Sequence, residues 1–144
     1  MSDPGELLII SNPEITSVEA AKIPHTEAHV DWNVGYAPTD FPRENARVVI
    51  GTVHAGGDGG FVEVSVAAMM NYAPEREPGE DFRSVLEEST ALETLWDIAR
   101  AAFYGTAGVA GVTISIPEEA PDAEFHLLRR VSEAEGSDDS PSEE

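Results

Sequence analysis

Two histidines, His25 and His29, stand four residues apart, close to the first clearly β-like run of the chain. Imidazole nitrogens are common zinc ligands, and residues four apart on a helix lie close enough to share one ion. Pro24 precedes the pair, however, and an alternating run follows it, so the pair belongs to a strand end rather than to a helix. A third ligand would have to come from Asp31, His54 or another carboxylate. We therefore predict solvated polar side chains here and no metal site.

The second candidate for chemistry is His54, which precedes Ala55-Gly56-Gly57. This turn resembles the His-Gly-Gly turn of hotdog-fold thioesterases, and that resemblance implies a buried helix whose dipole polarises an acyl thioester. Here the residues that follow, Phe61 to Tyr72, are β-like and include no acidic residue placed for catalysis. A hairpin turn is the better interpretation. A hotdog-type acyl-thioesterase is kept as an alternative.

No other stretch supplies a convincing set of catalytic groups. The glycine-rich segment Gly56 to Gly60 is not followed by a lysine, and Asp58 within it would repel a phosphate. No serine has the surroundings of an activated nucleophile. The sequence therefore predicts a binding or scaffolding protein, not an enzyme, and no cofactor.

Composition limits the class of partner. The chain has 144 residues, the length of one domain, and 41% hydrophobic residues, enough for a packed core. Its net charge of −20 disfavours binding to nucleic acid or to an anionic membrane. The absence of cysteine excludes disulfides and thiolate metal sites. The acidic N-terminus is unlike a signal peptide, and Leu7 to Ile10 is too short for a membrane span, so we expect a cytoplasmic protein.

Three β-like runs fill the first half of the chain. Ala28 to Ala37 alternates, which places four apolar side chains on one face: Val30, Trp32, Val34 and Tyr36. Ala46 to His54 and Phe61 to Tyr72 follow, and the glycine-rich turn between them predicts a hairpin. Near Ala67 to Met70 both faces of the third run are apolar, so both faces of the sheet would be covered there.

The most informative segment is an amphipathic helix, predicted over Asp81 to Tyr104. Its apolar residues recur with the three- and four-residue spacing of one buried face, at positions 82, 85, 86, 92, 95, 96, 99, 102 and 103. Asp81 suits the positive end of the helix, and Gly105 suits its stop. A short extended piece is predicted over Val109 to Pro117.

The segment from Asn12 to Ala21 has two interpretations. Asn12 followed by Pro13 would cap and open a helix, and these local signals slightly favour it. Ile15 to Glu19 would equally open a strand. We predict the strand, because of the family resemblance described next.

The order of these elements resembles the SecB-type export chaperone family, from Ile15 to about Pro117. Two stretches carry local similarity: Leu95 to Arg100 on the predicted helix, and Thr106 to Pro117 with its glycines, apolar residues and closing proline. The chain departs from the family at Asp97-Ile98, where Pro-Tyr is usual. It also departs at Gly108 to Gly111, where the family has a segment of the Phe-Pro-Pro-Leu type.

This resemblance implies an α+β fold, an antiparallel sheet of about four strands packed by one long C-terminal helix. It divides the chain into an N-terminal segment (1–13), a SecB-like domain (14–117) and a C-terminal extension (118–131). An acidic tail (132–144) follows. It has no large apolar residue, so we expect it to be disordered.

The resemblance also implies a homo-oligomer, a dimer or a tetramer, that holds non-native polypeptides without ATP, in protein export or in toxin–antitoxin control. A sheet with two apolar faces needs two covers, and one helix supplies only one. We expect client contacts at Val30, Trp32, Tyr36, Phe61, Met69 and Met70. We expect subunit contacts at Leu92, Leu95, Trp96 and Phe103. A structural or adaptor protein with one fixed protein partner is the alternative.

Overall fold

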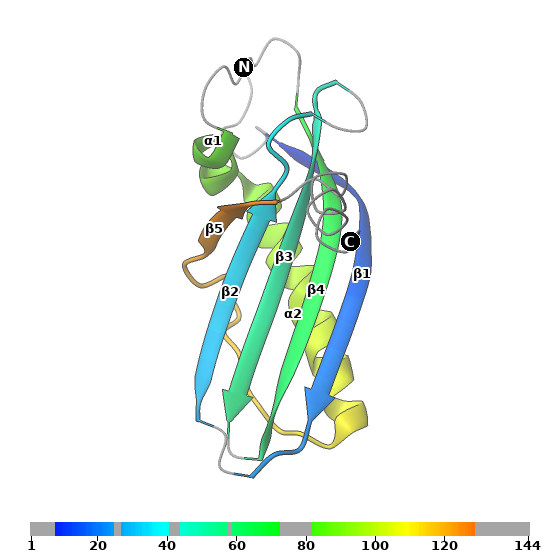
Figure 1. Ribbon diagram of the computed structural model, residues 1–144, viewed down its shortest axis with the longest axis vertical. Helices are drawn as coiled ribbons and strands as arrows, with labels where there is room; N and C mark the ends of the chain where they lie inside the picture. The colour runs from blue at the N-terminus through cyan, green and yellow to red at the C-terminus, as the bar shows by residue number, and fades with distance from the viewer. Residues whose placement is uncertain (1–7, 25–26, 41–43, 58, 73–81, 129–144) are drawn as a thin grey trace, which may run out of the picture.

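The computed structural model describes residues 8–24, 27–40, 44–57, 59–72 and 82–128. Within these residues, five strands form one mixed sheet that packs against two helices (Figure 1). The elements are β1 (Ile9–Ala21), β2 (His29–Tyr36), β3 (Ala46–Gly57), β4 (Gly60–Asn71), α1 (Phe82–Glu88), α2 (Thr90–Ala110) and β5 (Glu124–Leu127). The acidic tail predicted to be disordered lies outside the described residues.

The sheet has the strand order β1-β4-β3-β2-β5. β1, β4, β3 and β2 are antiparallel to their neighbours, as predicted, whereas β5 pairs in parallel with β2. The prediction of about four antiparallel strands is therefore corrected to five strands in a mixed sheet. The additional strand comes from the segment predicted as a C-terminal extension, because the chain crosses back from α2 to the free side of β2.

The first segment is a strand, β1, and not a helix. The pairing register shifts between Ser11 and Glu14, and Asn12 there has a φ of 49°. This irregularity accommodates Pro13, which has no amide hydrogen to donate and is tolerated only at an edge or a bulge. β1 is such an edge strand. The signals that slightly favoured a helix therefore mark a bulge.

The predicted hairpin is confirmed as β3 and β4. The two strands pair continuously from Gly57 opposite Gly60 to Ala46 opposite Asn71, so they extend into the glycine-rich turn. Gly59 has a φ of 110°, a conformation that side chains other than glycine rarely adopt. Along β4, the even-numbered residues from Val62 to Met70 are buried and the odd-numbered residues are half-buried, which matches the predicted alternation.

The predicted single helix is interrupted at Ser89. Ser89 has extended backbone angles, and its Oγ accepts a hydrogen bond from Ala91 N at 2.8 Å, so it caps the start of α2. α2 then continues past the predicted stop at Gly105 and ends at Gly111, whose φ of 75° is left-handed. The extended piece predicted over Val109 to Pro117 is not a strand. Its first two residues belong to α2, and residues 112–117 pair with no described strand.

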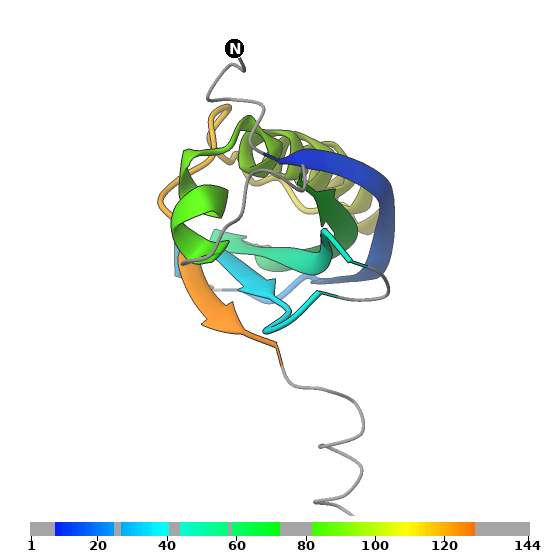
Figure 2. The same cartoon turned by 90° about the horizontal axis from the view of Figure 1, so that it is seen from above.

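The core lies between the sheet and α2. Seen from above, the sheet curves around α2, and β1 lies beside the helix (Figure 2). Trp32 of β2 meets Trp96 of α2 edge to face, with ring centroids 4.9 Å apart. Around this pair the fully buried side chains are Val34, Val49, Val53, Val62, Val64, Val66, Met70, Leu86, Leu95 and Phe103. One sheet face is thus covered by α2 over its central strands, and we call it the inner face.

Candidate functional site

The residues between α2 and β5 form a crossover segment, residues 112–123, that is bound to one flank of α2. The amide of Ile116 donates a hydrogen bond to the Tyr104 hydroxyl at 2.8 Å. The indole of Trp96 donates to the Pro117 carbonyl at 3.2 Å. Farther along, the Ala120 amide donates to Glu93 Oε2 at 3.0 Å. These contacts follow α2 back towards its start and fix the position from which the chain enters β5.

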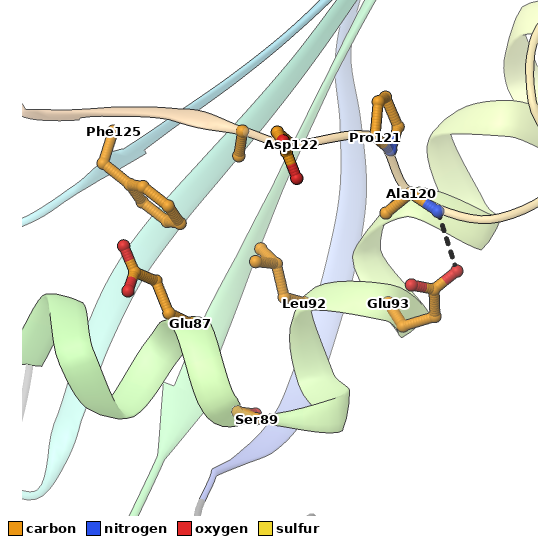
Figure 3. Close-up of a pocket in the computed structure, with 9 residues that line it drawn as sticks. Glu87, Ser89, Leu92, Glu93, Ala120, Pro121, Asp122 and Phe125 are labelled. Atoms are coloured by element: carbon orange, nitrogen blue, oxygen red, sulfur yellow. Dashed lines mark hydrogen bonds between the residues drawn. The ribbon is translucent and has the colours of Figure 1, made fainter.

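A pocket of about 410 Å³ lies where α1 meets α2 and where the crossover segment enters β5 (Figure 3). Leu92 and Phe125 point into it from opposite sides. We call it the crossover pocket. Its lining residues are Glu87, Ser89, Leu92, Glu93, Ala120, Pro121, Asp122, Ala123 and Phe125.

The crossover pocket has a mixed lining, in which Leu92 and Phe125 lie beside an acidic rim. Arg83 lies over the Phe125 ring, 5.1 Å from its centroid, and its Nε is 3.1 Å from Glu87 Oε2, so this side of the rim is held in place. Glu93 and Asp122 give the rim its negative charge, whereas the charge of Glu87 is offset by Arg83. Such a pocket suits an apolar side chain that is flanked by basic residues.

The lining does not indicate catalysis. Its titratable groups are carboxylates, and the hydroxyl of its one serine, Ser89, is occupied as the N-cap of α2. A nucleophile with a neighbouring base is not among the described lining residues.

A second candidate surface lies where β1 and α2 meet. Ile15 and Val18 of β1 are opposite Val66 and Val64 and so belong to the inner face, yet they are 52% and 51% exposed. Helical geometry places Val109, which is 92% exposed, on the flank of α2 opposite the crossover segment. We call Ile15, Val18 and Val109 the β1–α2 margin. It borders an open strand edge, whose backbone groups are available for pairing.

A third apolar surface lies on the outer face of the sheet. Val48 is opposite Met69, and Ile50 is opposite Ala67, in neighbouring positions of the β3–β4 pair. All four side chains are half-buried, and no element among the described residues packs over them. We call this set the outer patch. The predicted second apolar face therefore exists, and the described residues leave it uncovered.

The six predicted client contacts separate into two groups. Four are on the inner face: Trp32 and Met70 are 2% and 0% exposed beneath α2, and Val30 and Tyr36 are half-buried against the same core. Trp32 and Met70 therefore cannot reach a client in this conformation. Phe61 and Met69 are half-buried on the outer face, where a client contact is still a prediction. Alternation assigned the faces, but it could not tell which face the helix would cover.

The four predicted subunit contacts lie on α2. Leu95, Trp96 and Phe103 are 0% exposed, because they form the face that α2 packs against its own sheet. In this conformation they are core residues and are not available to a second subunit. Leu92 is half-buried and lines the crossover pocket instead.

The two histidine motifs of the sequence, the His54 turn and the His25–His29 pair, have the following places in the structure. His54 lies in β3, and the residues after it continue into the hairpin rather than opening a helix, so the geometry does not support a hotdog-type site. His54 Nδ1 is 2.8 Å from His29 Nε2. His25 lies outside the described residues.

The comparisons with known proteins support the fold. No protein-family model matches the sequence. No curated protein sequence matches it. Among proteins of known structure, the chain is similar to the SecB-like chaperone Rv1957 of Mycobacterium tuberculosis, which was captured with a ChAD peptide from the antitoxin HigA1, Rv1956. The TM-score is 0.55 at 18% sequence identity, over 82% of this chain and 94% of that chain. The fold is therefore SecB-like.

None of the described helices has both the length and the apolar composition needed to cross a bilayer.

Proposed function

We propose that this protein is an ATP-independent chaperone that holds non-native polypeptides, in protein export or in toxin–antitoxin control. The observation that carries the proposal is the SecB-like fold, shared over most of both chains with a chaperone that binds an antitoxin peptide. The apolar surfaces that the described residues leave open are consistent with it, because exposed apolar patches commonly mark interaction sites.

The client-binding site of this proposal is the crossover pocket together with the adjoining edge of β5. β5 is the outermost strand on its side of the sheet, and Leu127 on it is 59% exposed. An extended client segment that adds to this edge would gain main-chain hydrogen bonds whatever its sequence. One apolar side chain of the client would enter the pocket between Leu92 and Phe125. The acidic rim favours clients with lysine or arginine nearby.

The same proposal includes a homo-oligomer, a dimer or a tetramer, in the cytoplasm. The β1–α2 margin is the surface that we assign to the second protomer. β1 is the longest strand of the sheet, at 13 residues, and its outward edge carries no partner strand among the described residues. A second copy would cover Ile15, Val18 and Val109 and would pair the open edge of β1.

Reduced insulin provides a direct test. Its chains aggregate when dithiothreitol breaks their disulfides, and the reductant cannot alter this protein, which has no cysteine. We expect near-equimolar protein to suppress the light scattering without ATP. Suppression that requires ATP, or no suppression at a tenfold excess, would contradict the proposal. An adaptor with one fixed partner predicts no suppression.

Two variants locate the activity. Phe125→Ser removes the apolar side of the crossover pocket, and Ala123→Trp fills it, so both should lower the suppression. Ile23→Ser is the matched control, because Ile23 is 45% exposed and does not line the pocket. Circular dichroism establishes that each variant keeps its fold. If Phe125→Ser and Ala123→Trp suppress aggregation as well as the wild type and Ile23→Ser do, the crossover pocket is ruled out as the client site.

A further inference from the structure

Three side chains on the outer face of the sheet bring metal-ligating atoms together. His29 and Asp31 are on β2, and His54 is opposite Asp31 on β3. One ligand atom from each residue can be chosen so that all three lie within 4.8 Å of one another. His29 Nε2 is 2.8 Å from His54 Nδ1 and 4.0 Å from Asp31 Oδ2.

We propose that His29, Asp31 and His54 bind one divalent transition-metal ion, of which Zn²⁺ is the type. Imidazole nitrogen and carboxylate oxygen are ligands that suit Zn²⁺, and three protein ligands leave one position for water or for a partner's group. The sequence alone predicted no metal site, because the His25–His29 pair belongs to a strand end, and it named Asp31 and His54 only as third ligands to that pair. The structure pairs His29 with His54, which is distant in sequence and adjacent in the sheet. This inference does not depend on the chaperone function.

The first supporting observation is the orientation of His29. Its Nδ1 lies 2.9 Å from the carbonyl oxygen of Glu27. A carbonyl oxygen only accepts hydrogen bonds, so Nδ1 carries the hydrogen and Nε2 presents its lone pair to the cluster. Metal-ligating histidines typically have this arrangement, in which the other ring nitrogen donates to a carbonyl or carboxylate.

The second observation is that His54 is held between two rings. It stacks on His29 at a centroid distance of 4.8 Å and on Phe61 at 5.3 Å, with interplanar angles of 24° and 25°. Gly56, the residue paired with His29 on β3, has no side chain, so the His29 ring can lean towards His54. Ligands that are ordered before binding lose less entropy when the ion arrives.

The approach of the two rings is close to what one ion requires. Two nitrogens bound to one tetrahedral Zn²⁺ at about 2.0–2.1 Å lie roughly 3.3 Å apart, so the rings need to separate by about 0.5 Å. They must also turn, because the two nitrogens now point at each other and not at a common ion. The hydrogen on His54 Nδ1 must move to Nε2 or to solvent. These adjustments are available, because the cluster faces outward and the His29 side chain is 32% exposed.

The surrounding charge favours a cation. Asp31, with a side chain 62% exposed, supplies the carboxylate of the cluster. Glu63 of β4 is opposite His54 on its other side, and Glu19 of β1 is opposite Glu63. Residues paired in this way share a face of the sheet, so a row of carboxylates adjoins the two histidines. The negative potential raises the local concentration of divalent cations.

Isothermal titration of the untagged full chain with Zn²⁺ tests the site. We expect one ion per chain, and an affinity that falls at acidic pH because the ligands must be deprotonated. His29→Gln and His54→Gln should each weaken binding by at least about tenfold. His126→Gln is the control, since His126 is on β5 and outside the cluster. Binding that is unchanged in both cluster variants would overturn the proposal.

A second measurement separates this site from the His25–His29 pair, and its first part uses the unaltered protein. Addition of Zn²⁺ to the unaltered protein should shift the NMR signals of the His29 and His54 rings and leave those of His126 in place. His25→Gln should retain the titration. Loss of binding in His25→Gln together with unshifted His54 signals would place the ion elsewhere and refute the cluster.

Discussion

Tyr72 at the end of β4 donates its hydroxyl hydrogen to Asp40, whose two carboxylate oxygens lie 2.7 and 2.6 Å from the phenol oxygen. Asp40 belongs to the loop between β2 and β3. It also accepts hydrogen bonds from the backbone amide of Asn45 at 3.0 Å and from Arg47 Nε at 3.1 Å. Arg47 in turn lies over the ring of Phe82, 4.7 Å from its centroid. One carboxylate thus links the loop, two strands and α1.

This network predicts how stability depends on acid. Burial raises the pKa of Asp40, but the hydrogen bonds from Tyr72, Asn45 and Arg47 outweigh it and hold that pKa below 3.8. A lowered pKa means that the unfolded chain binds the proton more readily. The contribution of Asp40 to stability is therefore present above the unfolded pKa, near 4, and is lost as the pH falls below it. Asp40→Asn should cost about 1–3 kcal/mol at neutral pH.

Urea unfolding between pH 2 and 7 provides the check. The chain has 28 acidic residues, so the slope of the wild-type curve alone is not diagnostic. The difference between the wild type and Asp40→Asn isolates the one carboxylate, and it should shrink as the pH falls below 4. A difference that stays constant across the range would contradict the assigned cause.

At alkaline pH, Tyr72 makes stability depend on pH with the opposite sign. Burial, followed by the hydrogen bond to Asp40 and its negative charge, raises the pKa of Tyr72 to about 12. The stability that Tyr72 contributes is therefore complete below pH 10 and declines as the pH rises towards 12. Titration of the phenolate absorbance should show one tyrosine that ionises late in the wild type. In Tyr72→Phe that late step should be absent, and its persistence would assign it to another residue.

The helix break at Ser89 predicts a measurable cap. Ser89→Ala removes the acceptor for the Ala91 amide and should destabilise the protein by about 0.5–2 kcal/mol. Thr94→Ala is the control, because its hydroxyl only donates back to the Thr90 carbonyl on the exposed side of the same helix. Thermal or urea unfolding compares the two. Equal effects would show that the Ser89 hydroxyl has no capping role.

Glycines in two environments give the next prediction. A Cβ at Gly51, on the inner face of β3, would collide with the Trp32 ring and approach Leu95 Cδ2 to 2.9 Å. Gly51→Ala should therefore destabilise the protein by about 1–3 kcal/mol. Gly105 lies in α2 with nothing within 4 Å of its Cβ position, so Gly105→Ala should stabilise by about 0.5–1 kcal/mol. Opposite shifts in the denaturant midpoint are expected, and shifts of the same sign would refute this account of the packing.

The β1–α2 margin predicts the state of assembly. Light scattering coupled to size exclusion, at moderate salt to screen the net charge of −20, should give a dimer or a tetramer. The double variant Ile15→Asp and Val18→Asp should reduce the mass to that of one chain, because it places charge on the surface assigned to the second copy. Ile9→Asp is the control on the same strand, 64% exposed and paired with Asn71 on the outer face. A wild-type monomer would contradict the assigned assembly.

The parts of the fold that depend on local periodicity could be predicted from the sequence. Alternation predicted β2 and β4 and the division of their side chains between two faces, and the β-branched residues of Ala46 to His54 predicted β3. The strand at Ile15 came from the family resemblance, since local signals slightly favoured a helix there. The helix break had a visible signal in the step of six positions from Leu86 to Leu92, where the three- and four-residue spacing fails at Ser89.

Other features depend on contacts that no local pattern contains. Three glycines follow the last aromatic pair of α2, and only Gly111 takes up the left-handed conformation that ends the helix. β5 is four residues long and exists because the crossover segment delivers it to the free side of β2. The crossover pocket depends on the same crossing. The burial of Trp32 and Met70 was undetermined, because two apolar faces compete for one helix.

The proposed chaperone function requires that this protein bind many unrelated extended polypeptides at the crossover pocket. Fluorescence anisotropy tests this with a panel of labelled peptides that differ in sequence, titrated with the wild type and with Phe125→Ser. Most peptides with apolar and basic residues should bind the wild type, and Phe125→Ser should weaken the binding of all of them together. Binding of one peptide alone, or of none, would contradict the proposed function.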